Sequence, residues 1–275
     1  MKFGSRLIFQ YKGTVFMKPR ILIKIGGRAF EGKNGFKDLA QAIRYSQNVE
    51  IIIVHGGGAE ISQALKDANR ESVFVDGIRV THAEDIKIVE NVLSGTINQR
   101  IASWLSQNGV PCSRMSGKTK RLFIVEPLKR HGHDLGFVGK IRQVNPDVVL
   151  DALKIGRVPV VSPISGNEGG ESYNVNADSA AAALAAGVQC TDLVFITDVP
   201  GVIVGDDVYH YLTIKEAKTF IAEGTIKGGM IAKMESAFEA LDKKVSRVHI
   251  IQWQGSETLQ NIIEKKCETG TIINN

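Results

Sequence analysis

The chain has 275 residues, of which 43% are hydrophobic and 23% are charged, so it has enough apolar material for one large domain or two lobes that share a sheet. No apolar run approaches the length of a membrane-spanning helix. The net charge of +5 would suit nucleic acid, but the basic residues are mostly spread out and are not interleaved with aromatic residues. We therefore expect small anionic ligands, and neither nucleic acid nor a membrane as a partner.

The three cysteines, Cys112, Cys190 and Cys267, lie far apart and have neither metal-ligand nor redox spacing. A sparse, odd number of cysteines is typical of a reducing compartment, so we expect a cytoplasmic protein. The first residues do not have the pattern of a signal peptide. Because Met17 shortly precedes the first clear strand, we expect residues 1–18 to be a short N-terminal extension without stable structure.

Two successive units follow, in each of which an apolar strand leads through glycines into a helix. The first unit has a strand at Arg20–Ile25, the glycines Gly26 and Gly27, and a helix at Phe36–Tyr45. The second unit has a strand at Val49–Val54, the glycines Gly56–Gly58, and a helix from about Ala59 to Ala68. Two such units in succession predict a parallel sheet with helices on both faces.

The middle of the chain is predicted to contain a hairpin, a long helix and several short strands. Asp76-Gly77 is a favourable hairpin turn between strands at 73–75 and 78–80. Apolar residues at helical spacing from Ile86 to Leu105 predict a long helix, which Gly109 ends. We expect further strands at 110–114, 122–125, 136–144 and 158–161, and a helix at 147–153.

The last third begins with Asn174–Asp178, which follows a glycine-rich turn and opens an alanine-rich helix. Thr213 and Glu216 have the spacing of a capping box. Gly228 and Gly229 open another helix, whose buried stripe leaves Lys233 to one side. The other elements are expected to be strands at 193–197, 202–204, 247–251 and 271–273, and helices that end near 222 and 265.

Several familiar site motifs are incomplete. Ser116–Thr119 ends like a phosphate-binding P-loop but lacks the earlier glycine, so we interpret it as a solvated turn. The second glycine cluster lacks the third glycine of a dinucleotide-binding fingerprint. His131 and His133 have no third ligand nearby, and we expect no metal-ligating residues in this chain.

The remaining pattern fits phosphoryl transfer, which needs alignment and positive charge more than covalent help from the protein. Glycine turns let backbone N–H groups approach phosphate oxygens, and lysine supplies a compact positive charge. Lys24 lies just before the first glycine pair and Lys233 just after Gly228 and Gly229. A lysine within a buried strand is costly unless it is used, which favours a functional role for Lys24, whereas Lys233 alone would equally suit a solvated helix surface.

Two further candidates remain open at this stage. Asn174, Asn176 and Asp178 lie beside a helix N-terminus, where anions bind readily, but a helix cap with a solvated aspartate would use the same residues. Arg79 would bind a carboxylate in bidentate fashion, or it would be an exposed arginine on a strand.

Six sequence segments together resemble the amino acid kinase family. They are Lys24–Gly27, Val54–Gly58, Gly77–Thr81, Asn174–Asp178, Thr197–Gly201 and Gly228–Lys233. The resemblance extends from about Arg20 to the C-terminus and implies an α/β fold, an open three-layer αβα sandwich with a mainly parallel sheet of about eight strands. It implies an N-terminal lobe at 19–170 that binds an acyl amino acid and forms the dimer contact, and a C-terminal lobe at 171–275 that binds MgATP, with one continuous sheet.

The reaction that the resemblance implies is ATP-dependent phosphorylation of the side-chain carboxylate of N-acetyl-L-glutamate, the second step of arginine synthesis. One alternative is a kinase for another acyl acidic amino acid, such as carrier-bound aminoadipate in lysine synthesis. Another alternative is a non-catalytic nucleotide-binding regulator. The implied cofactors are ATP and Mg²⁺, the latter held mainly by phosphates.

The resemblance also implies roles for individual residues. Lys24 and Lys233 would stabilise the transferring phosphoryl group, and Asp178 would orient both lysines. The substrate-binding residues would be Gly57, Gly58, Arg79, Asn174 and Asn176. The nucleotide-binding residues would be Lys24, Gly26, Gly27, Gly57, Asp198, Gly201, Gly229, Met230 and Lys233.

The segment His249–Gln254 departs from family members that arginine inhibits, because it lacks their Asp-Gly-Arg sequence. We therefore expect a homodimer that is insensitive to arginine.

Overall fold

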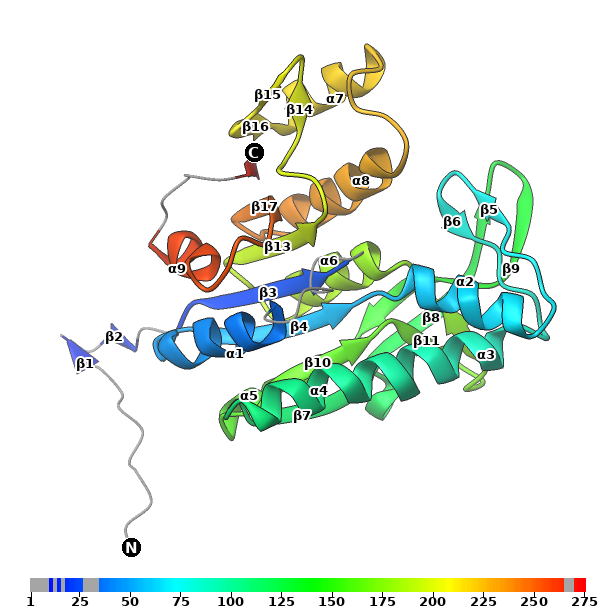
Figure 1. Ribbon diagram of the computed structural model, residues 1–275, viewed down its shortest axis with the longest axis horizontal. Coiled ribbons are helices and arrows are strands. Elements are labelled where there is room, and N and C mark those ends of the chain that lie inside the picture. Colours follow the sequence, from blue (N-terminus) through cyan, green and yellow to red (C-terminus); the bar gives the residue numbers. More distant parts are fainter. Residues whose placement is uncertain (1–9, 12–13, 16–17, 27–34, 265–269) are drawn as a thin grey trace, which may run out of the picture.

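The computed structural model describes residues 10–11, 14–15, 18–26, 35–264 and 270–275. An eight-stranded sheet with the order β16-β18-β17-β13-β3-β4-β10-β7 forms its centre (Figure 1). All neighbouring strands are parallel except the pair β17 and β18. The strands are β3 (Arg20–Ile25), β4 (Glu50–His55), β7 (Cys112–Ser116), β10 (Val158–Ser162), β13 (Asp192–Thr197), β16 (Tyr211–Thr213), β17 (Arg247–Gln252) and β18 (Thr271–Asn274).

Helices cover both faces of this sheet because its central strands are apolar on both sides. Leu22 of β3 belongs to one buried cluster, together with residues of α5, α6 and α8. Ile21 and Ile23, its neighbours in β3, belong to a second cluster with residues of α1, α4 and α9. The predicted three-layer αβα architecture is therefore confirmed. The α-helices are α1 (Gly35–Tyr45), α2 (Gly58–Asp67), α3 (Ile86–Glu90), α4 (Asn98–Gln107), α5 (Asp147–Lys154), α6 (Ala177–Gly187), α7 (Ile214–Ala222), α8 (Gly229–Asp242) and α9 (Glu257–Ile263).

The first and second halves of the chain occupy different parts of the molecule. In Figure 1 the blue-to-green residues form the lower part and the hairpins on the right, and the yellow-to-red residues form the upper part. The two parts meet where β3 pairs with β13 in parallel, so one sheet continues through both.

Small accessory sheets extend from the central one. Strands β8 and β9 form a long hairpin that closes into a small barrel with β11 and β12. The remaining accessory strands pair β1 with β2, β5 with β6, and β14 with β15. The accessory strands are β1 (Gln10–Tyr11), β2 (Thr14–Val15), β5 (Phe74–Val75), β6 (Ile78–Arg79), β8 (Phe123–Arg130), β9 (His133–Val144), β11 (Ile164–Gly166), β12 (Ser172–Asn174), β14 (Ile203–Val204) and β15 (Asp207–Val208). Most of the expected N-terminal extension lies outside the described residues.

The hairpin of β8 and β9 is longer than the two short strands that we expected. His131 and Gly132 have φ values of 48° and 77° and form a tight turn that matches the twist of the flanking strands. Asp76 and Gly77, with φ values of 48° and 77°, form the same kind of turn between β5 and β6, as predicted. The turn at His131 and Gly132 was not predicted because the residues around it are polar.

The long helix predicted from Ile86 to Leu105 is continuous, but its middle is not α-helical. A π-helical segment, η1 (Asn91–Ile97), separates α3 from α4. Gly109, with φ 81°, follows the helix end as expected. Apolar spacing alone does not distinguish a π segment, because its side chains still fall on the buried face.

The Ser116–Thr119 turn is packed rather than solvated. A Cβ atom on Gly117 would lie 2.3 Å from the Ser165 hydroxyl oxygen and 2.6 Å from the Phe123 ring. Lys118 Nζ lies 2.7 Å from Ser172 Oγ and 3.1 Å from Glu90 Oε1. The glycine in this motif is therefore explained by close packing. Among the described residues, no helix is long and apolar enough to cross a membrane.

The capping box that opens α7 is confirmed. Glu216 N donates to Thr213 Oγ1 over 3.2 Å, and Thr213 N donates to Glu216 Oε2 over 2.8 Å. We predict that Thr213→Ala lowers the free energy of unfolding by about 1 kcal/mol, because a helix N–H loses its partner. Urea unfolding measures this change. Thr219→Ala, at an exposed position of the same helix, is the matched control and should change stability by less than about 0.5 kcal/mol; equal effects would contradict the capping role.

Candidate active site

Two lysines from opposite parts of the chain share one aspartate at the carboxyl ends of the central strands. Lys24 Nζ lies 2.7 Å from Asp178 Oδ1, and Lys233 Nζ lies 2.8 Å from Asp178 Oδ2. The side chains of Lys24, Lys233 and Asp178 are 10%, 11% and 13% exposed, respectively. Two ammonium groups are thus held close together in a nearly dry site, where charges interact more strongly than in water.

The start of α6 fixes the position of Asp178. Asn176 is the N-cap, and its side-chain oxygen accepts hydrogen bonds from Asp178 N over 2.9 Å and Ser179 N over 3.1 Å. Asp178 in the first turn is further favoured by the positive end of the helix dipole. The helix cap is therefore confirmed at Asn176, but Asp178 binds two lysines rather than solvent.

Lys233 approaches Asp178 from the first turns of α8. Its ammonium group also lies 4.9 Å from the centroid of the buried Phe195 ring, at a distance suited to a cation–π contact. Gly228, with φ 58° and ψ −137°, begins this helix in a backbone conformation that residues other than glycine rarely adopt. Lys233 is therefore not a solvated helix lysine.

The electrostatics of the three groups are coupled. Burial alone would raise the pKa of Asp178, but the charges of Lys24 and Lys233 outweigh it and hold this pKa at about 2. Burial lowers the pKa of Lys233, which the Asp178 carboxylate partly offsets. The aspartate therefore stays ionised at neutral pH and compensates part of the positive charge.

Glycine turns line the same edge of the sheet. A Cβ atom on Gly26 would lie 2.5 Å from Lys24 Nζ, so a larger residue there would displace the ammonium group. A Cβ atom on Gly57 would lie 2.2 Å from Ile97 Cδ1, whereas Gly58 begins α2 with no atom that close. Gly27 lies outside the described residues.

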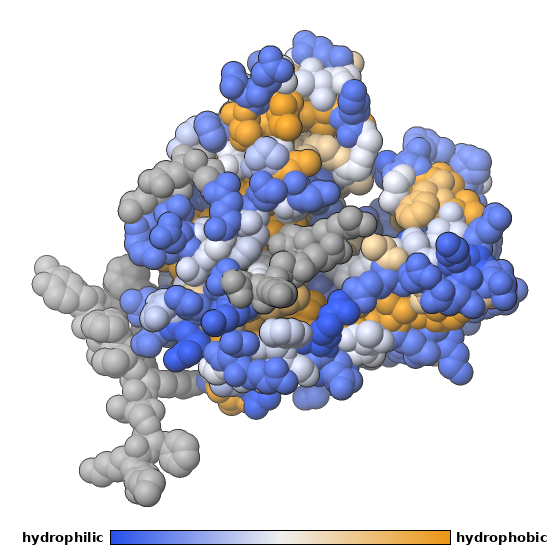
Figure 2. Space-filling model, viewed as in Figure 1, coloured by the Kyte–Doolittle hydropathy of each residue, from blue (hydrophilic) through white to orange (hydrophobic). Residues whose placement is uncertain are grey.

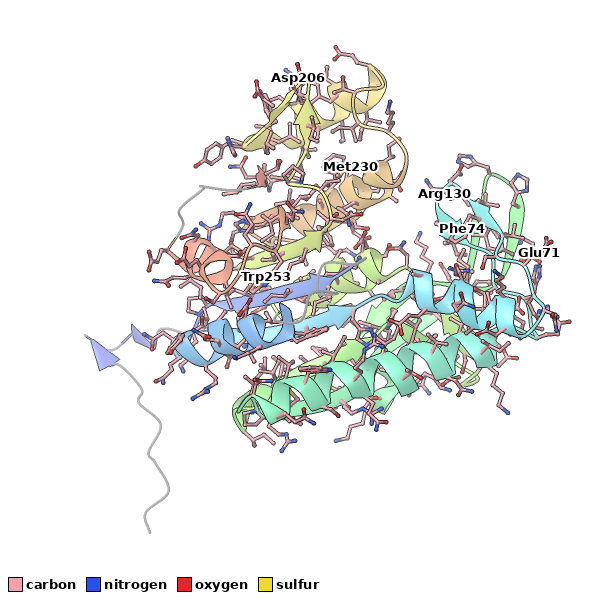
Figure 3. All side chains as sticks on the ribbon, in the orientation of Figure 1. Glu71, Phe74, Arg130, Asp206, Met230 and Trp253 are labelled. Atoms are coloured by element: carbon pink, nitrogen blue, oxygen red, sulfur yellow. The ribbon has the colours of Figure 1, made fainter. Side chains whose placement is uncertain are left out.

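Arg79 is buried beside the start of α2. Its Nη2 donates to Gly58 O over 2.9 Å and to Ser62 Oγ over 2.8 Å, and its Nη1 donates to Ser72 Oγ over 2.7 Å. Phe74 lies over the guanidinium at 4.6 Å and is labelled in Figure 3. Within the described part of the chain, no carboxylate forms an ion pair with Arg79, and burial lowers its pKa. A buried cation of this kind is suited to an anionic ligand.

Phe74 belongs to an apolar patch on the β5–β6 hairpin. The side chains of Val73 and Phe74 are 44% and 52% exposed, and Figure 2 shows apolar residues gathered over this hairpin. Phe74, the member of this patch that stacks on the Arg79 guanidinium, shields that face of the cation from water.

Of the two asparagines predicted to bind substrate, Asn174 contacts the segment that follows Arg79. Asn174, at the end of β12, donates from Nδ2 to Thr81 Oγ1 over 3.1 Å, and Thr81 follows Arg79 by two residues. Asn176 is engaged as a helix cap. The structure thus brings Arg79 to Gly58, and Asn174 to the segment that follows Arg79.

Four of the expected nucleotide-binding residues follow β13 or begin α8. Asp198 accepts a hydrogen bond from Thr197 Oγ1 over 3.1 Å. Gly201 is tightly packed, since a Cβ atom there would lie 2.8 Å from Thr271 Oγ1. Gly229 and Met230 begin α8, and Met230 is labelled in Figure 3.

Arg130 connects the β5–β6 hairpin to α8. Its Nη1 and Nη2 lie 3.3 Å from the Glu235 carboxylate on α8, two residues after Lys233, and its Nε lies 3.2 Å from Asp76 Oδ2 in the β5–β6 turn. A side chain of the β8–β9 hairpin therefore bridges the hairpin of Arg79 and the helix of Lys233.

Sequence reasoning missed the residues that support the predicted ones. Ser62, Ser72 and Phe74 surround Arg79, and Phe195 lies beside Lys233. They are ordinary residues in ordinary elements, and only the tertiary fold brings them to the site. His55, which precedes the second glycine cluster, carried a signal that could have been used, since a histidine at the end of a buried strand needs partners.

A profile of the amino acid kinase family matches residues 19–252. An acetylglutamate kinase from a Geobacillus species is 37% identical over 235 residues, which cover 86% of this chain and 91% of the relative. The acetylglutamate kinase of Kosmotoga olearia is 36% identical, with 98% of this chain and 94% of the relative covered.

Two solved structures are similar in fold. The protein smu.665 from Streptococcus mutans is 26% identical, with a TM-score of 0.78 over 94% of this chain and 99% of that chain. A carbamate kinase from Giardia is 14% identical, with a TM-score of 0.65 over 94% of this chain and 99% of that chain.

We predict that Asp178→Asn is less stable than the wild type above pH 4 and that the difference shrinks toward pH 2. The carboxyl group has a pKa of about 2 in the folded protein, below its ordinary value of 3.8, so its stabilisation is fully present above 3.8 and is lost as the pH falls through 2. The loss is on the order of 2 kcal/mol.

Urea unfolding from pH 5 to pH 2.5 measures this difference. Asp151→Asn is the control, because the Asp151–Lys154 pair is exposed and such pairs contribute little. A difference between the wild type and Asp178→Asn that does not change with pH would contradict the prediction.

Proposed function

Since the chain belongs to the amino acid kinase family, we propose that it transfers the γ-phosphoryl group of ATP to the side-chain carboxylate of N-acetyl-L-glutamate. The single observation that carries this proposal is the pair of buried ammonium groups, Lys24 and Lys233, on the Asp178 carboxylate. We infer the substrate from the acetylglutamate kinases to which the chain is similar.

In the proposed reaction, a carboxylate oxygen of the substrate attacks the γ-phosphorus and the bond from that phosphorus to the β–γ bridging oxygen breaks. The products are ADP and the acyl phosphate. No general base is needed, because the attacking carboxylate is already ionised at neutral pH. The protein contributes alignment and positive charge on the three oxygens of the transferring group.

Lys24 and Lys233 supply that charge in the proposal. Asp178 binds both ammonium groups and keeps them in fixed directions, so that little reorganisation is needed when charge moves during transfer. The backbone N–H groups of Gly26, Gly27 and Gly57 would face phosphate oxygens. Gly26 is suited to this role because a side chain there would collide with Lys24 Nζ.

The acyl amino acid would bind on the side of Arg79. The guanidinium would pair with the α-carboxylate of the substrate, since it is buried and three hydrogen bonds hold it in place. Gly57 and Gly58 would line the pocket, and Asn174 and Asn176 would lie near the acetamido and carboxylate groups. Residues 19–170 would form this substrate lobe.

Residues 171–275 would form the nucleotide lobe, with Asp198, Gly201, Gly229 and Met230 near ATP. The site presents lysines and backbone N–H groups to the phosphates, and both Asp178 oxygens already bind lysines. These residues fit a Mg²⁺ ion that is held mainly by phosphates and water, as Mg²⁺ prefers. When bound, Mg²⁺ would neutralise phosphate charge.

We further propose a cytoplasmic homodimer, insensitive to arginine, that joins through the N-terminal lobe. Strand β7 is an edge of the central sheet, and edge strands are open to pairing. Beside it, Trp104 and Ile155 are 43% and 72% exposed. Light scattering that gives a monomer or a hexamer would contradict this proposal.

Hydroxylamine trapping of the acyl phosphate with MgATP tests the function. The acids to compare are N-acetylglutamate, glutamate, N-acetylaspartate and N-acetyl-aminoadipate. We expect product with N-acetylglutamate alone. Product with another acid would assign the protein to a different pathway. ATP binding without any product would favour a carrier-bound substrate or a regulatory role.

We predict that Lys24→Ala and Lys233→Ala reduce kcat by about 100-fold or more, with much smaller changes in substrate affinity, because each charge acts chiefly in the transition state. Steady-state kinetics and nucleotide titration separate the two effects. Lys243→Ala is the control, since Lys243 lies at the other end of α8 and its pair with Glu239 is exposed. A variant of either lysine that lost only substrate or nucleotide affinity, with kcat unchanged, would contradict this assignment.

We predict that Arg79→Ala raises the KM for N-acetylglutamate by about 10-fold or more and changes the KM for ATP little, because a charged carboxylate contact made before the transition state is lost. The control is Arg70→Ala, whose guanidinium pairs with Glu84 and Asp85 outside the site. An unchanged KM would remove Arg79 from the site.

A further inference from the structure

His55 is a buried titratable residue that the proposed transfer does not use. It is the last residue of β4 and directly precedes Gly56–Gly58. Its exposed fraction is 1%, so the hydrogen-bonding atoms of its ring need partners within the protein.

The partners of His55 define its tautomer. Nδ1 lies 3.0 Å from the carbonyl oxygen of Gly56, and because a carbonyl can only accept, Nδ1 carries the proton. Nε2 lies 3.1 Å from Asn98 Nδ2. In a neutral ring this second nitrogen is an acceptor, so it accepts from the Asn98 amide.

Asn98 is itself held in the orientation that this bond requires. Its Nδ2 donates to Val160 O over 2.9 Å, and its Oδ1 accepts from Arg114 Nε over 3.2 Å. The buried amide therefore cannot exchange its oxygen and nitrogen without losing these bonds. A chain of hydrogen bonds thus runs from Arg114 on strand β7 through Asn98 and His55 to Gly56.

This series of hydrogen bonds fixes the orientation of a peptide group in the glycine turn. The C=O of Gly56 and the N–H of Gly57 belong to one planar trans peptide, in which they point in opposite directions. Holding the Gly56 carbonyl toward His55 therefore directs the Gly57 N–H away from it. The other side of Gly56 is also fixed, because its own N–H donates to Ile25 O over 3.0 Å.

The π-helical segment packs against the same turn. Ile97 and Leu93 occupy the space beside Gly57, where a Cβ atom would lie 2.2 Å and 3.0 Å from their methyl groups. Arg114 Nη2 donates to Ser94 O in this segment over 3.0 Å. Asn98 directly follows this segment. The segment therefore determines both the packing against Gly57 and the position of the Asn98 amide that donates to His55. Such segments are often found at functional sites.

We propose that His55 is a positioning residue, which holds the Gly56 carbonyl so that the Gly57 N–H is aimed at a phosphate oxygen of the nucleotide. The inference rests on the proposed function, since it assigns this N–H to the transferring or bridging phosphate. Burial lowers the pKa of His55 to about 4, which keeps the ring neutral and the Nδ1 proton in place at neutral pH.

The first test is the tautomer of His55 in the wild-type protein. Long-range ¹H–¹⁵N NMR should show a neutral Nδ1–H ring from pH 6 to pH 8, assigned by the signal that His55→Asn removes. An Nε2–H ring, or a protonated one in this range, would overturn the proposal, and this result needs no activity.

The second test compares two substitutions of His55. Asn places an amide donor near the former Nδ1, whereas Gln places it near the former Nε2. We expect His55→Gln to lower kcat by roughly 10- to 100-fold, with the KM for N-acetylglutamate changed by less than about 3-fold, because a misaimed donor acts on the transition state. His55→Asn should recover most of that loss.

His249→Gln is the matched control. His249 is also buried, at 4% exposure, and it lies 2.8 Å from Asp192 Oδ1, a residue at the opposite ends of the strands. We expect this variant to lower the Tm and to retain kcat at temperatures below melting. An equal loss of kcat in His249→Gln, an unchanged kcat in His55→Gln, or no recovery in His55→Asn would each overturn the positioning role.

The failure of the proposed function would look different. A wild-type protein that makes no acyl phosphate would overturn the function. The role of His55 would then be decided by its tautomer and by ATP affinity, which His55→Gln should weaken and His55→Asn should restore. Equal ATP affinities in the two variants would overturn it.

Discussion

The structure depends on one electrostatic constraint, which is that two lysine ammonium groups are held close together at a nearly dry edge of a sheet. Like charges in such a place repel strongly, and each loses hydration on burial. Asp178 offsets both the repulsion and the lost hydration, because each of its oxygens binds one ammonium group. Its carboxylate is in turn favoured by the start of α6, so the helix, the aspartate and the two lysines form one unit.

The sheet topology explains how these groups meet. Lys24 comes from β3, and Lys233 from α8, which packs on the sheet together with α6. In parallel sheets the carboxyl ends of the strands gather at one edge, and that edge is where ligands bind. The glycine turns after β3 and β4 lie at this edge. The accessory hairpins extend beyond it, and Arg130 ties one of them to α8. Lys24 and Lys233, which come from distant parts of the chain, are therefore joined at one central carboxylate.

Much of the fold could be predicted from the sequence, because apolar strands followed by glycines have few alternatives. Lys24 stood out since a buried strand rarely contains a lysine, and the structure explains it by Asp178. The supporting residues could not be predicted in this way. The π segment preserves the apolar pattern of a regular helix, and the role of Asn98 depends on Val160 and Arg114, which are distant in sequence. The packed Gly117 turn was missed because close contact with Ser165 is a tertiary property.

The central claim is that Asp178 acts through the two lysines, and a double-mutant cycle tests it most directly. Single-turnover rates of phosphoryl transfer would be measured for Lys24→Met, Asp178→Asn and the double variant, each with saturating MgATP. The account predicts strong non-additivity, with the double variant within about 3-fold of the slower single variant, because groups that act as one unit fail together. Losses that simply multiply would show that Asp178 and Lys24 act independently and would contradict the account.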